Sequence, residues 1–446
     1  MTRLHAACFA AALAAAPLHA DWTRFRGPGG TGIAEGPPAP AEWSADTNLK
    51  WKAELPGLGS SSPVVAAGRV YVTAYTGYGQ EPGRLGDAAQ LTRHLLAYDR
   101  RIGEELWRHS EAAPEPDAED PYQGFITQHG YASSTPAADA ERVYALLGKS
   151  GLFALTHDGE LAWRVELGGR SDPAKWGDGS SPALIGGSLV VNAGILGHAL
   201  VGLDPETGEE AWRVEDEAFT NAWSTPVPVE AGGRTLAVFA VPKQVVAVDA
   251  ETGEVAWKAD HEIADSTASS LVASSGEGGT VLSLMGGREG FATAWRVPTS
   301  GGEPQELWRG RLRSGIGTPV AVDGVLYWPS GGVLHAARLS DGGLVFKERL
   351  PRFDGGGGGF GSMDYSSPVV SGGRILFVSR GGEGYALRPG ESLDVAAHNR
   401  PFEGDASSFN ATPAVSDGDL FLRSEKFLYC LGRVNRDGPS PVVDVP

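Results

Sequence analysis

Short runs of alternating apolar and polar residues, separated by glycine-rich turns, recur along the chain. The segment from Pro182 to Trp212, PALIGGSLVVNAGILGHALVGLDPETGEEAW, contains four such runs. Because successive side chains of a strand point to opposite faces of a sheet, runs of this length and alternation predict strands. The glycine turns between consecutive runs predict antiparallel hairpins. The segment therefore predicts a unit of four antiparallel strands.

This unit repeats along the chain. A Ser-Ser-Pro or Ser-Thr-Pro triplet, or a close variant of it, marks the start of each copy, and a leucine replaces the proline once. The marking positions are Pro63, Pro136, Pro182, Pro226, Leu271, Pro319, Pro368 and Pro413, spaced by 73, 46, 44, 45, 48, 49 and 45 residues. Four strands at a period near 45 residues are typical of a propeller blade. We predict an all-β, eight-bladed propeller with four-stranded antiparallel blades.

The last unit is incomplete, because only three strands follow Pro413. The missing outer strand is found near the start of the chain, in LKWKAEL around Trp51. We predict that this N-terminal strand completes the last blade and closes the ring, which leaves no terminal blade to peel away. The expected organisation is a leader over residues 1–20, an N-terminal extension over 21–48, the propeller over 49–433 and a tail over 434–446.

The last turn of each unit has its own pattern, seen as Ala247-x-Asp249-x-x-Thr252-Gly253-x-x-x-Trp257. It resembles the tryptophan-docking motif of the pyrroloquinoline quinone (PQQ) repeat family. Residues 21–30, DWTRFRGPGG, also resemble the opening of exported members of that family. The resemblance implies that the indole packs between neighbouring blades while Asp and Thr-Gly shape the turn. The sixth unit has Phe346 in place of the tryptophan, and the seventh has no aromatic residue there.

The resemblance also implies two types of function. Quinoprotein dehydrogenases of the family hold PQQ and calcium at the channel, whereas members of the BamB type hold no cofactor and bind a partner protein. This sequence has no adjacent cysteine pair, which caps PQQ in alcohol dehydrogenases, and no matching Glu/Asn/Asp calcium set. We therefore predict no metal site, leave the cofactor unassigned and keep PQQ with calcium as the less favoured alternative.

The start of the chain and the overall charge indicate where the protein acts. Residues 1–20 contain one cation, Arg3, then an apolar run that ends in small residues, which is typical of a secretory leader. Cys8 falls inside this leader, so Cys430 remains alone. The net charge of −18 disfavours nucleic acid. We expect an exported monomer, periplasmic or secreted, with no transmembrane segment, whose partner is a protein or a small anionic ligand.

Candidate binding residues come from two sets of loops that meet on one face of a propeller. The hairpins between the second and third strands carry a cation in five units, at Lys149, Lys243, Arg288, Arg380 and Lys426. Cations gathered at a channel mouth would attract a carboxylate or a phosphate. The alternative is that these hairpin tips are only solvated.

The loops that enter the innermost strands supply the second set, which includes His129, Trp176, Asp178, Trp223 and Asp364. These side chains could form a catalytic bowl, or they could satisfy the strand starts and fill the channel. Trp176 and Trp223 are the expected stacking surface for a flat ligand. We predict a ligand-binding or protein-interaction module with no assigned catalytic residue; the alternative is a PQQ-dependent oxidoreductase with the cofactor at the channel.

Overall fold

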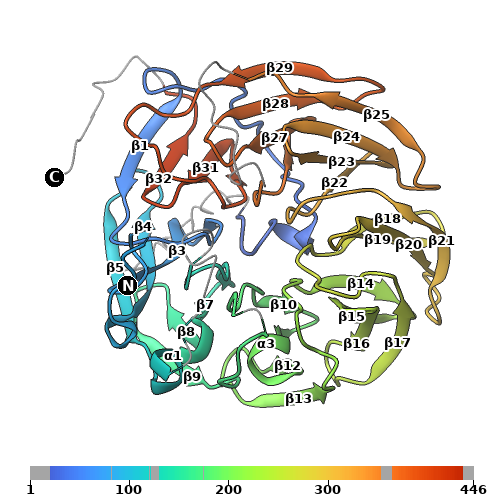
Figure 1. The fold of residues 1–446 in the computed structure, drawn as a ribbon, viewed down its shortest axis with the longest axis horizontal. Helices are drawn as coiled ribbons and strands as arrows, with labels where there is room; N and C mark the ends of the chain where they lie inside the picture. The colour runs from blue at the N-terminus through green and yellow to red at the C-terminus, as the bar shows by residue number, and fades with distance from the viewer. Residues whose placement is uncertain are drawn as a thin grey trace, which may run out of the picture.

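The computed structural model confirms the predicted propeller. It describes residues 21–434, apart from 82, 120, 122–129, 174 and 353–363. Eight sheets of four strands each are arranged as a ring around a central channel, as Figure 1 shows. Each innermost strand begins at the residue directly after a predicted marker; β2 starts at Val64 and β18 starts at Val272. The predicted leader, most of the predicted tail and His129 lie outside the described residues.

Blades one to four run from the innermost to the outermost strand in chain order. Blade one contains β2 (Val64–Ala66), β3 (Arg69–Thr76), β4 (Thr92–Asp99) and β5 (Glu105–Ala112). Blade two contains β6 (Ala137–Ala138), β7 (Arg142–Leu146), β8 (Leu152–Thr156) and β9 (Leu161–Val165). Blade three contains β10 (Ala183–Ile185), β11 (Ser188–Ala193), β12 (Ala199–Leu203) and β13 (Glu210–Glu215). Blade four contains β14 (Val227–Ala231), β15 (Arg234–Val241), β16 (Gln244–Asp249) and β17 (Val255–Asp260).

Blades five to seven follow the same order, and blade eight uses both ends of the chain. Blade five contains β18 (Val272–Gly276), β19 (Gly279–Gly286), β20 (Phe291–Val297) and β21 (Gln305–Arg311). Blade six contains β22 (Val320–Val322), β23 (Val325–Ser330), β24 (Val333–Arg338) and β25 (Leu344–Arg349). Blade seven contains β26 (Val369–Ser371), β27 (Arg374–Val378), β28 (Gly384–Arg388) and β29 (Asp394–Asn399). Blade eight contains β30 (Ala414–Ser416), β31 (Asp419–Arg423), β32 (Phe427–Leu431) and β1 (Leu49–Glu54).

Helical structure in the described residues is limited to short turns. They are η1 (Pro28–Gly30), η2 (Ala88–Gln90), α1 (Glu115–Glu119), η3 (Gly148–Ser150) and α3 (Gly194–Gly197). No helix in this part of the chain is long and apolar enough to cross a membrane.

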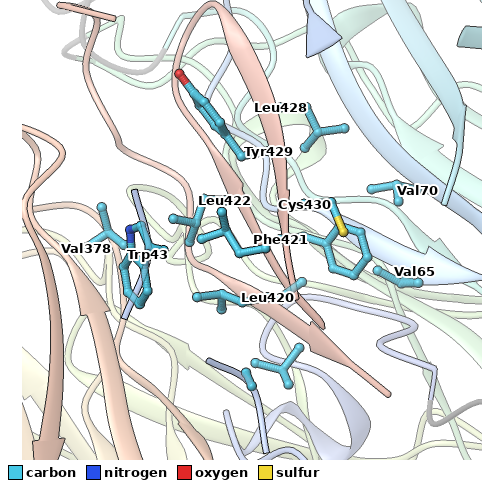
Figure 2. Close-up of a cluster of buried hydrophobic side chains, with 14 of the residues drawn as sticks. Trp43, Val65, Val70, Val378, Leu420, Phe421, Leu422, Leu428, Tyr429 and Cys430 are labelled. Atoms are coloured by element: carbon cyan, nitrogen blue, oxygen red, sulfur yellow. The ribbon is translucent and has the colours of Figure 1, made fainter. Parts of the chain in front are cut away.

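Closure of the ring through β1 is confirmed. β1 pairs antiparallel with β32, and Trp51 lies opposite Cys430 in the register. Cys430 is completely buried in the cluster shown in Figure 2, together with Phe421 of the same blade and Val65 of blade one. The two ends of the propeller domain therefore share one sheet and one hydrophobic core.

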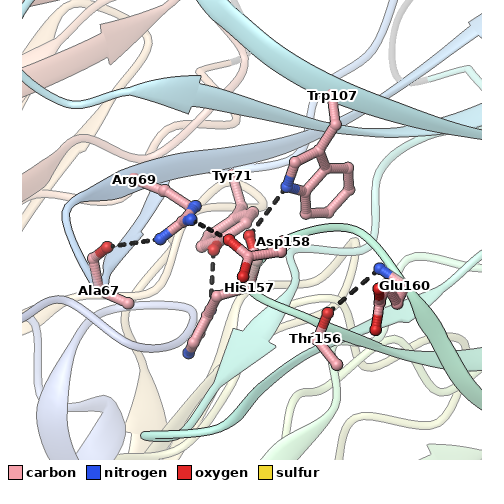
Figure 3. A network of polar contacts seen from close by, with 8 residues as sticks. All are labelled: Ala67, Arg69, Tyr71, Trp107, Thr156, His157, Asp158 and Glu160. Carbon is pink, nitrogen blue, oxygen red and sulfur yellow. Dashed lines mark hydrogen bonds and ion pairs between the residues drawn. The ribbon is translucent and has the colours of Figure 1, made fainter.

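The tryptophans of the repeats dock against the next blade, as the family resemblance implies. Trp107 donates its Nε1 hydrogen to the carbonyl of His157 at 2.9 Å, in the turn that ends β8 (Figure 3). A Cβ placed on Gly159 of that turn would lie 2.9 Å from the indole, so the ring needs a glycine there. Trp51, Trp163, Trp212 and Trp308 cover the corresponding turns in the same way, through Gly103, Gly208, Gly253 and Gly342.

Blade seven confirms the predicted loss of its docking aromatic, since Ala397 occupies that position in β29. An indole from elsewhere packs beside it. Trp43 of the N-terminal extension lies between blades seven and eight, near Val378 and Leu420 (Figure 2). Its backbone nitrogen donates to Asn399 Oδ1 at 2.9 Å, and its side chain is only 4 % exposed. Sequence analysis missed this contact, because Trp43 stands outside the repeats.

The extension also crosses the axis of the ring, where the dark blue segment runs through the middle of Figure 1. Trp22 and Val65 of blade one exchange two backbone hydrogen bonds of 2.9 Å, and Ala138 of blade two donates to Thr23 at 2.8 Å. Farther along the extension, Val370 of blade seven donates to Gly32 at 2.7 Å. Residues 22–34, which we call the plug, thereby tie together blades one, two and seven.

Candidate functional site

A cavity of about 670 Å³ occupies the central channel above the plug. Its lining comes mainly from the loops that precede the innermost strands, whereas the backbone of the plug bonds to residues after the marker positions, such as Val65 and Val370. The order of these residues along each innermost strand therefore gives the order of the cavity and the plug along the channel axis. The cavity lies at the loop end of the channel, and the plug closes it from below.

A ring of hydroxyl groups encircles the base of the cavity. In every blade the residue before the marker position is Ser or Thr, and its hydroxyl accepts a backbone N–H from the corresponding residue of the blade before it in the ring. The links, 2.9 to 3.2 Å long, join Ser62, Thr135, Ser181, Thr225, Ser270, Thr318, Ser367 and Thr412, and Thr412 donates back to Ser62. All eight residues line the cavity and are buried. We call this closed circuit the hydroxyl collar.

The collar explains the recurrent triplet. In blade one the first serine, Ser61, accepts the backbone N–H of Thr73 in the second strand of its own blade at 2.9 Å. The second, Ser62, accepts the backbone N–H of Thr412 in the blade before it in the ring. Pro63 then directly precedes the innermost strand, at the edge of the sheet, where a missing N–H is tolerated. The second hydroxyl of the triplet is present in all eight blades because it forms a link of the collar, whereas the first is replaced by Gly317 in blade six and by Ala411 in blade eight.

The floor of the cavity is made by the plug. Phe25 lines the cavity, and the flanking residues Arg24 and Arg26 are buried below it, 5 % and 1 % exposed. Arg24 donates to the carbonyl of Pro226, and Arg26 donates to the carbonyls of Thr318 at 2.6 Å and Pro319 at 2.7 Å. These acceptors are neutral, and no carboxylate in the described part of the chain pairs with either arginine within 4 Å.

Both arginines remain cations under the cavity. Burial lowers the pKa of Arg24 to about 10 and that of Arg26 to about 9, because a guanidinium loses hydration inside the protein. Both values are above neutral pH, so two positive charges with no carboxylate partner in the described residues stand beneath Phe25. Their field favours a negative ligand above the floor.

The cavity has an aromatic wall on the side of blades three and four. Trp176 and Trp223 lie with ring centroids 5.6 Å apart and planes inclined at 35°. Trp223 is held by donation from its Nε1 to the carbonyl of Gly177 at 2.6 Å. Both tryptophans line the cavity and are partly exposed. The prediction that these two residues form one aromatic surface in the channel agrees with their placement; contact with a ligand stays a prediction.

Two arginines stand on the side of blades five and six. Arg288 and Arg313 line the cavity, and both are exposed at the rim. The Nε of Arg288 lies 3.8 Å from Asp265 Oδ2, a partner outside the cavity lining. Among the described residues that line the cavity there is no aspartate or glutamate, although the chain has 55 of them. The lining therefore carries only positive formal charge.

Two carboxyl groups lie just behind this lining. Asp178, between Gly177 and the lining residue Gly179, is buried, and burial raises the pKa of its carboxyl to about 7. Burial also raises the pKa of Asp364, although its Oδ1 accepts the backbone N–H of Arg380 at 3.0 Å. Desolvation thus reduces the negative charge of Asp178 near neutral pH.

The five predicted cations are placed differently from one another. Arg288 lines the cavity, and Arg380 lies 5.3 Å from the ring of the lining residue Tyr365. Lys149 is buried in η3, whereas Lys243 and Lys426 are exposed and do not line the cavity. The structure therefore brings Arg288, Trp176 and Trp223 together, with Asp178, Asp364 and Arg380 behind them. Ligand binding by any of these residues remains a prediction.

Calcium does not fit the residues seen here. No group of three or more His, Cys, Asp or Glu side chains in the described parts of the chain could hold a metal ion. The lining offers hydroxyls, arginines and aromatic rings, whereas calcium prefers several carboxylate and carbonyl oxygens. We therefore derive no chemical step through a quinone cofactor.

Comparisons with solved structures agree with the fold. BamB from Moraxella catarrhalis is 13% identical, with a TM-score of 0.57, covering 88% of this chain and 99% of its own. Quinohemoprotein alcohol dehydrogenase from Comamonas testosteroni is 13% identical, with a TM-score of 0.60, covering 94% of this chain and 82% of its own. A europium-containing methanol dehydrogenase is 10% identical, with a TM-score of 0.61, covering 93% and 98%. At these identities the likeness concerns the fold alone.

No curated protein matches the chain. The profile of the PQQ-repeat family described as outer membrane protein assembly factor BamB matches residues 33–119, 91–342 and 197–435. These overlapping matches cover most of the chain. The protein therefore belongs to this family of PQQ-repeat β-propellers.

Proposed function

We propose that this protein is an exported, non-catalytic propeller that binds a small anionic molecule in its channel cavity. The observation that carries the proposal is the charge of the lining, which contains Arg288 and Arg313 and no described carboxylate in a chain of net charge −18. A cation-rimmed, partly dehydrated cavity attracts carboxylates and phosphates. Export rests on the leader-like residues 1–20.

The shape of the cavity supports a compact organic ligand. A volume of about 670 Å³ is in the range of small-molecule sites. Trp176 and Trp223 offer an apolar wall opposite the arginines, so one side of a ligand can stack while another carries its charge. The plug closes the lower end, which suits retention of a ligand rather than passage through the ring.

The test is calorimetric titration with trimesate, a benzene ring that bears three carboxylates. We expect binding that weakens as salt is added, and a loss of about tenfold or more in affinity for the double variant Arg288→Gln/Arg313→Gln. The control is Arg338→Gln/Arg388→Gln, which removes the same charge from arginines paired with Asp341 and Asp394 away from the cavity. Equal affinity of both double variants would contradict the proposal.

A second pair of variants locates the site. Ala268 lines the cavity, so Ala268→Trp should fill it and abolish binding, whereas Ala218→Trp on an exposed loop should not. The non-catalytic part is tested by adding PQQ, calcium, an alcohol and an artificial electron acceptor. Alcohol-dependent reduction of the acceptor by the wild type would overturn it and favour the quinoprotein alternative.

A further inference from the structure

The hydroxyl groups of the collar keep hydrogen-bond donors that the fold does not use. Each of its eight hydroxyl oxygens already accepts a backbone N–H. A hydroxyl that accepts in this way keeps its own proton to donate. None of these protons is donated in a hydrogen bond to the described residues, although each side chain is at most 4 % exposed. The base of the cavity is therefore a circle of buried donors.

The charges around the collar also favour a ligand that accepts hydrogen bonds and carries negative charge. Arg24 and Arg26 stand below it without carboxylate partners in the described chain, and Arg26 bonds to the carbonyl of the collar residue Thr318 itself. Phe25 supplies an apolar floor that offers no competing acceptor. Donors on the wall and cations beneath the floor both favour ligand oxygens that accept hydrogen bonds and carry negative charge.

The width of the collar limits what can satisfy it. Each collar residue is joined to the next by one hydrogen bond of 2.9 to 3.2 Å, so adjacent residues are roughly 5 Å apart and eight of them enclose a circle roughly 12 Å across. One small oxyanion can reach only part of such a circle. A compact molecule that carries several oxyanionic groups around its edge can reach donors on opposite sides at once.

We propose that the hydroxyl collar is a recognition site for compact polyanions, whose carboxylate or phosphate groups accept hydrogen bonds from several blades together. This inference rests on the proposed function and narrows its ligand to molecules rich in acceptors and poor in donors. A ligand edged with amide or amine hydrogens would face the collar protons with nothing to accept them, and would be rejected. The arginines at the rim attract the anion, and the collar selects it.

The test compares benzoate, isophthalate and trimesate, which carry one, two and three carboxylates, with the neutral triamide of trimesate. We expect affinity to rise about tenfold with each added carboxylate and the triamide not to bind. Thr225→Val and Thr318→Val each remove one collar donor and should weaken trimesate about fivefold or more while changing benzoate less. Thr225→Ser and Thr318→Ser keep the hydroxyl and should bind trimesate like the wild type.

Thermal melting of each variant establishes that it is folded before its affinity is compared. If trimesate binds no tighter than benzoate, or if the folded valine variants keep full affinity for trimesate, the collar is not the recognition site. That result leaves the proposed function standing, provided that Arg288→Gln/Arg313→Gln still weakens all three acids. If no acid binds the wild type, both proposals fail.

Discussion

The outer and inner circumferences of this propeller join the blades in different ways. On the outside, each docked indole contacts one neighbouring turn, as Trp212 does with Gly253 and the carbonyl of Ala250. This set is irregular: blade six uses Phe346, blade seven has Ala397, and Trp257 Nε1 has no hydrogen-bond partner among the described residues. On the inside, the hydroxyl collar is complete in all eight blades.

The difference shows which contacts can be replaced. An outer indole acts through apolar area and shape, so another aromatic ring can take its place, and Trp43 from the N-terminal extension packs where blade seven offers none. The side chain of a collar residue must accept the backbone N–H of one blade at a fixed position, while its own backbone N–H donates to the next blade, and a Ser or Thr hydroxyl does this in all eight blades. The outer contacts stabilise the ring pairwise, whereas the inner contacts also form the surface of the cavity.

Removal of the N-terminal segment should have the largest effect, because it affects both circumferences. Deletion of residues 21–56 takes away the plug, Trp43 and the whole of β1, including Trp51. We expect a sharp fall in melting temperature, since blade eight loses its outer strand and the ring loses its closure. Deletion of residues 21–34 alone keeps Trp43 and β1 and should cost much less. Similar melting temperatures for the longer deletion and the full chain would contradict the role of β1.

Loss of a docked indole should have the next largest effect. Replacement of Trp212, which is 7 % exposed, by alanine should lower the free energy of unfolding by about 3 to 5 kcal/mol. Trp212→Phe should cost about 1 kcal/mol more than Trp257→Phe, because only Trp212 gives up a hydrogen bond from Nε1. Chemical denaturation measures all three changes. A Trp212→Ala protein of normal stability that has lost trimesate binding would show that the indole is part of the site instead.

Two aspartates, one from each circumference, should respond to pH with opposite signs. Burial raises the pKa of Asp178 beside the cavity to about 7 from an ordinary value of 3.8, so its carboxyl destabilises the fold increasingly as pH rises from about 4 to 7. Asp204, in an outer turn, accepts the backbone N–H groups of Glu206 and Thr207, which lower its pKa, so it stabilises the fold at neutral pH and loses this effect in acid.

Asp178→Asn should therefore raise the melting temperature at pH 8 by several degrees and leave it unchanged near pH 4. Asp204→Asn should lower the melting temperature at pH 8, with a difference that disappears below its lowered pKa. Parallel scans of both variants and the wild type across this range measure the effect. A difference for Asp178→Asn that does not vary with pH would mean that its carboxyl titrates normally and that burial does not shift it.

The repeats predicted the fold because each blade start and each docking turn is a local pattern of a few residues. The triplet at Pro182 marks a strand start by its residue types alone. LKWKAEL around Trp51 could be assigned to blade eight because the last repeat supplies only three strands. The plug could not be predicted in this way. Arg24 and Arg26 are buried by carbonyls some 200 and 290 residues away, at Pro226 and Thr318, and their own segment has no period.

The candidate site was predictable in part for the same reason. Hairpin position identified Arg288 and loop position identified Trp176 and Trp223, but the direction of a side chain depends on the conformation of its hairpin. Lys149 falls in the short helix η3, which buries it, although its sequence position matches that of Arg288. The hydroxyl before each marker was visible in all eight repeats, but a closed circuit of bonds is a property of the ring and of no single blade.

A single link of the collar should have the smallest effect on stability. Thr412 accepts the backbone N–H of Ser367 at 3.0 Å and lies in the last blade, and Thr412→Val keeps its shape while removing the acceptor. The buried N–H of Ser367 is then left without a partner, which should cost about 1 to 3 kcal/mol in the free energy of unfolding. Thr412→Ser restores the acceptor and should recover most of this loss.

An outer turn provides a matched control for this collar link. Thr252 accepts the N–H of Glu254 at 3.3 Å in an exposed turn, where water can replace the hydroxyl. Thr252→Val should therefore cost about 0.5 kcal/mol or less. Chemical denaturation of the three variants decides the comparison. Equal losses for Thr412→Val and Thr252→Val would mean that the collar holds the blades no more firmly than a solvated turn.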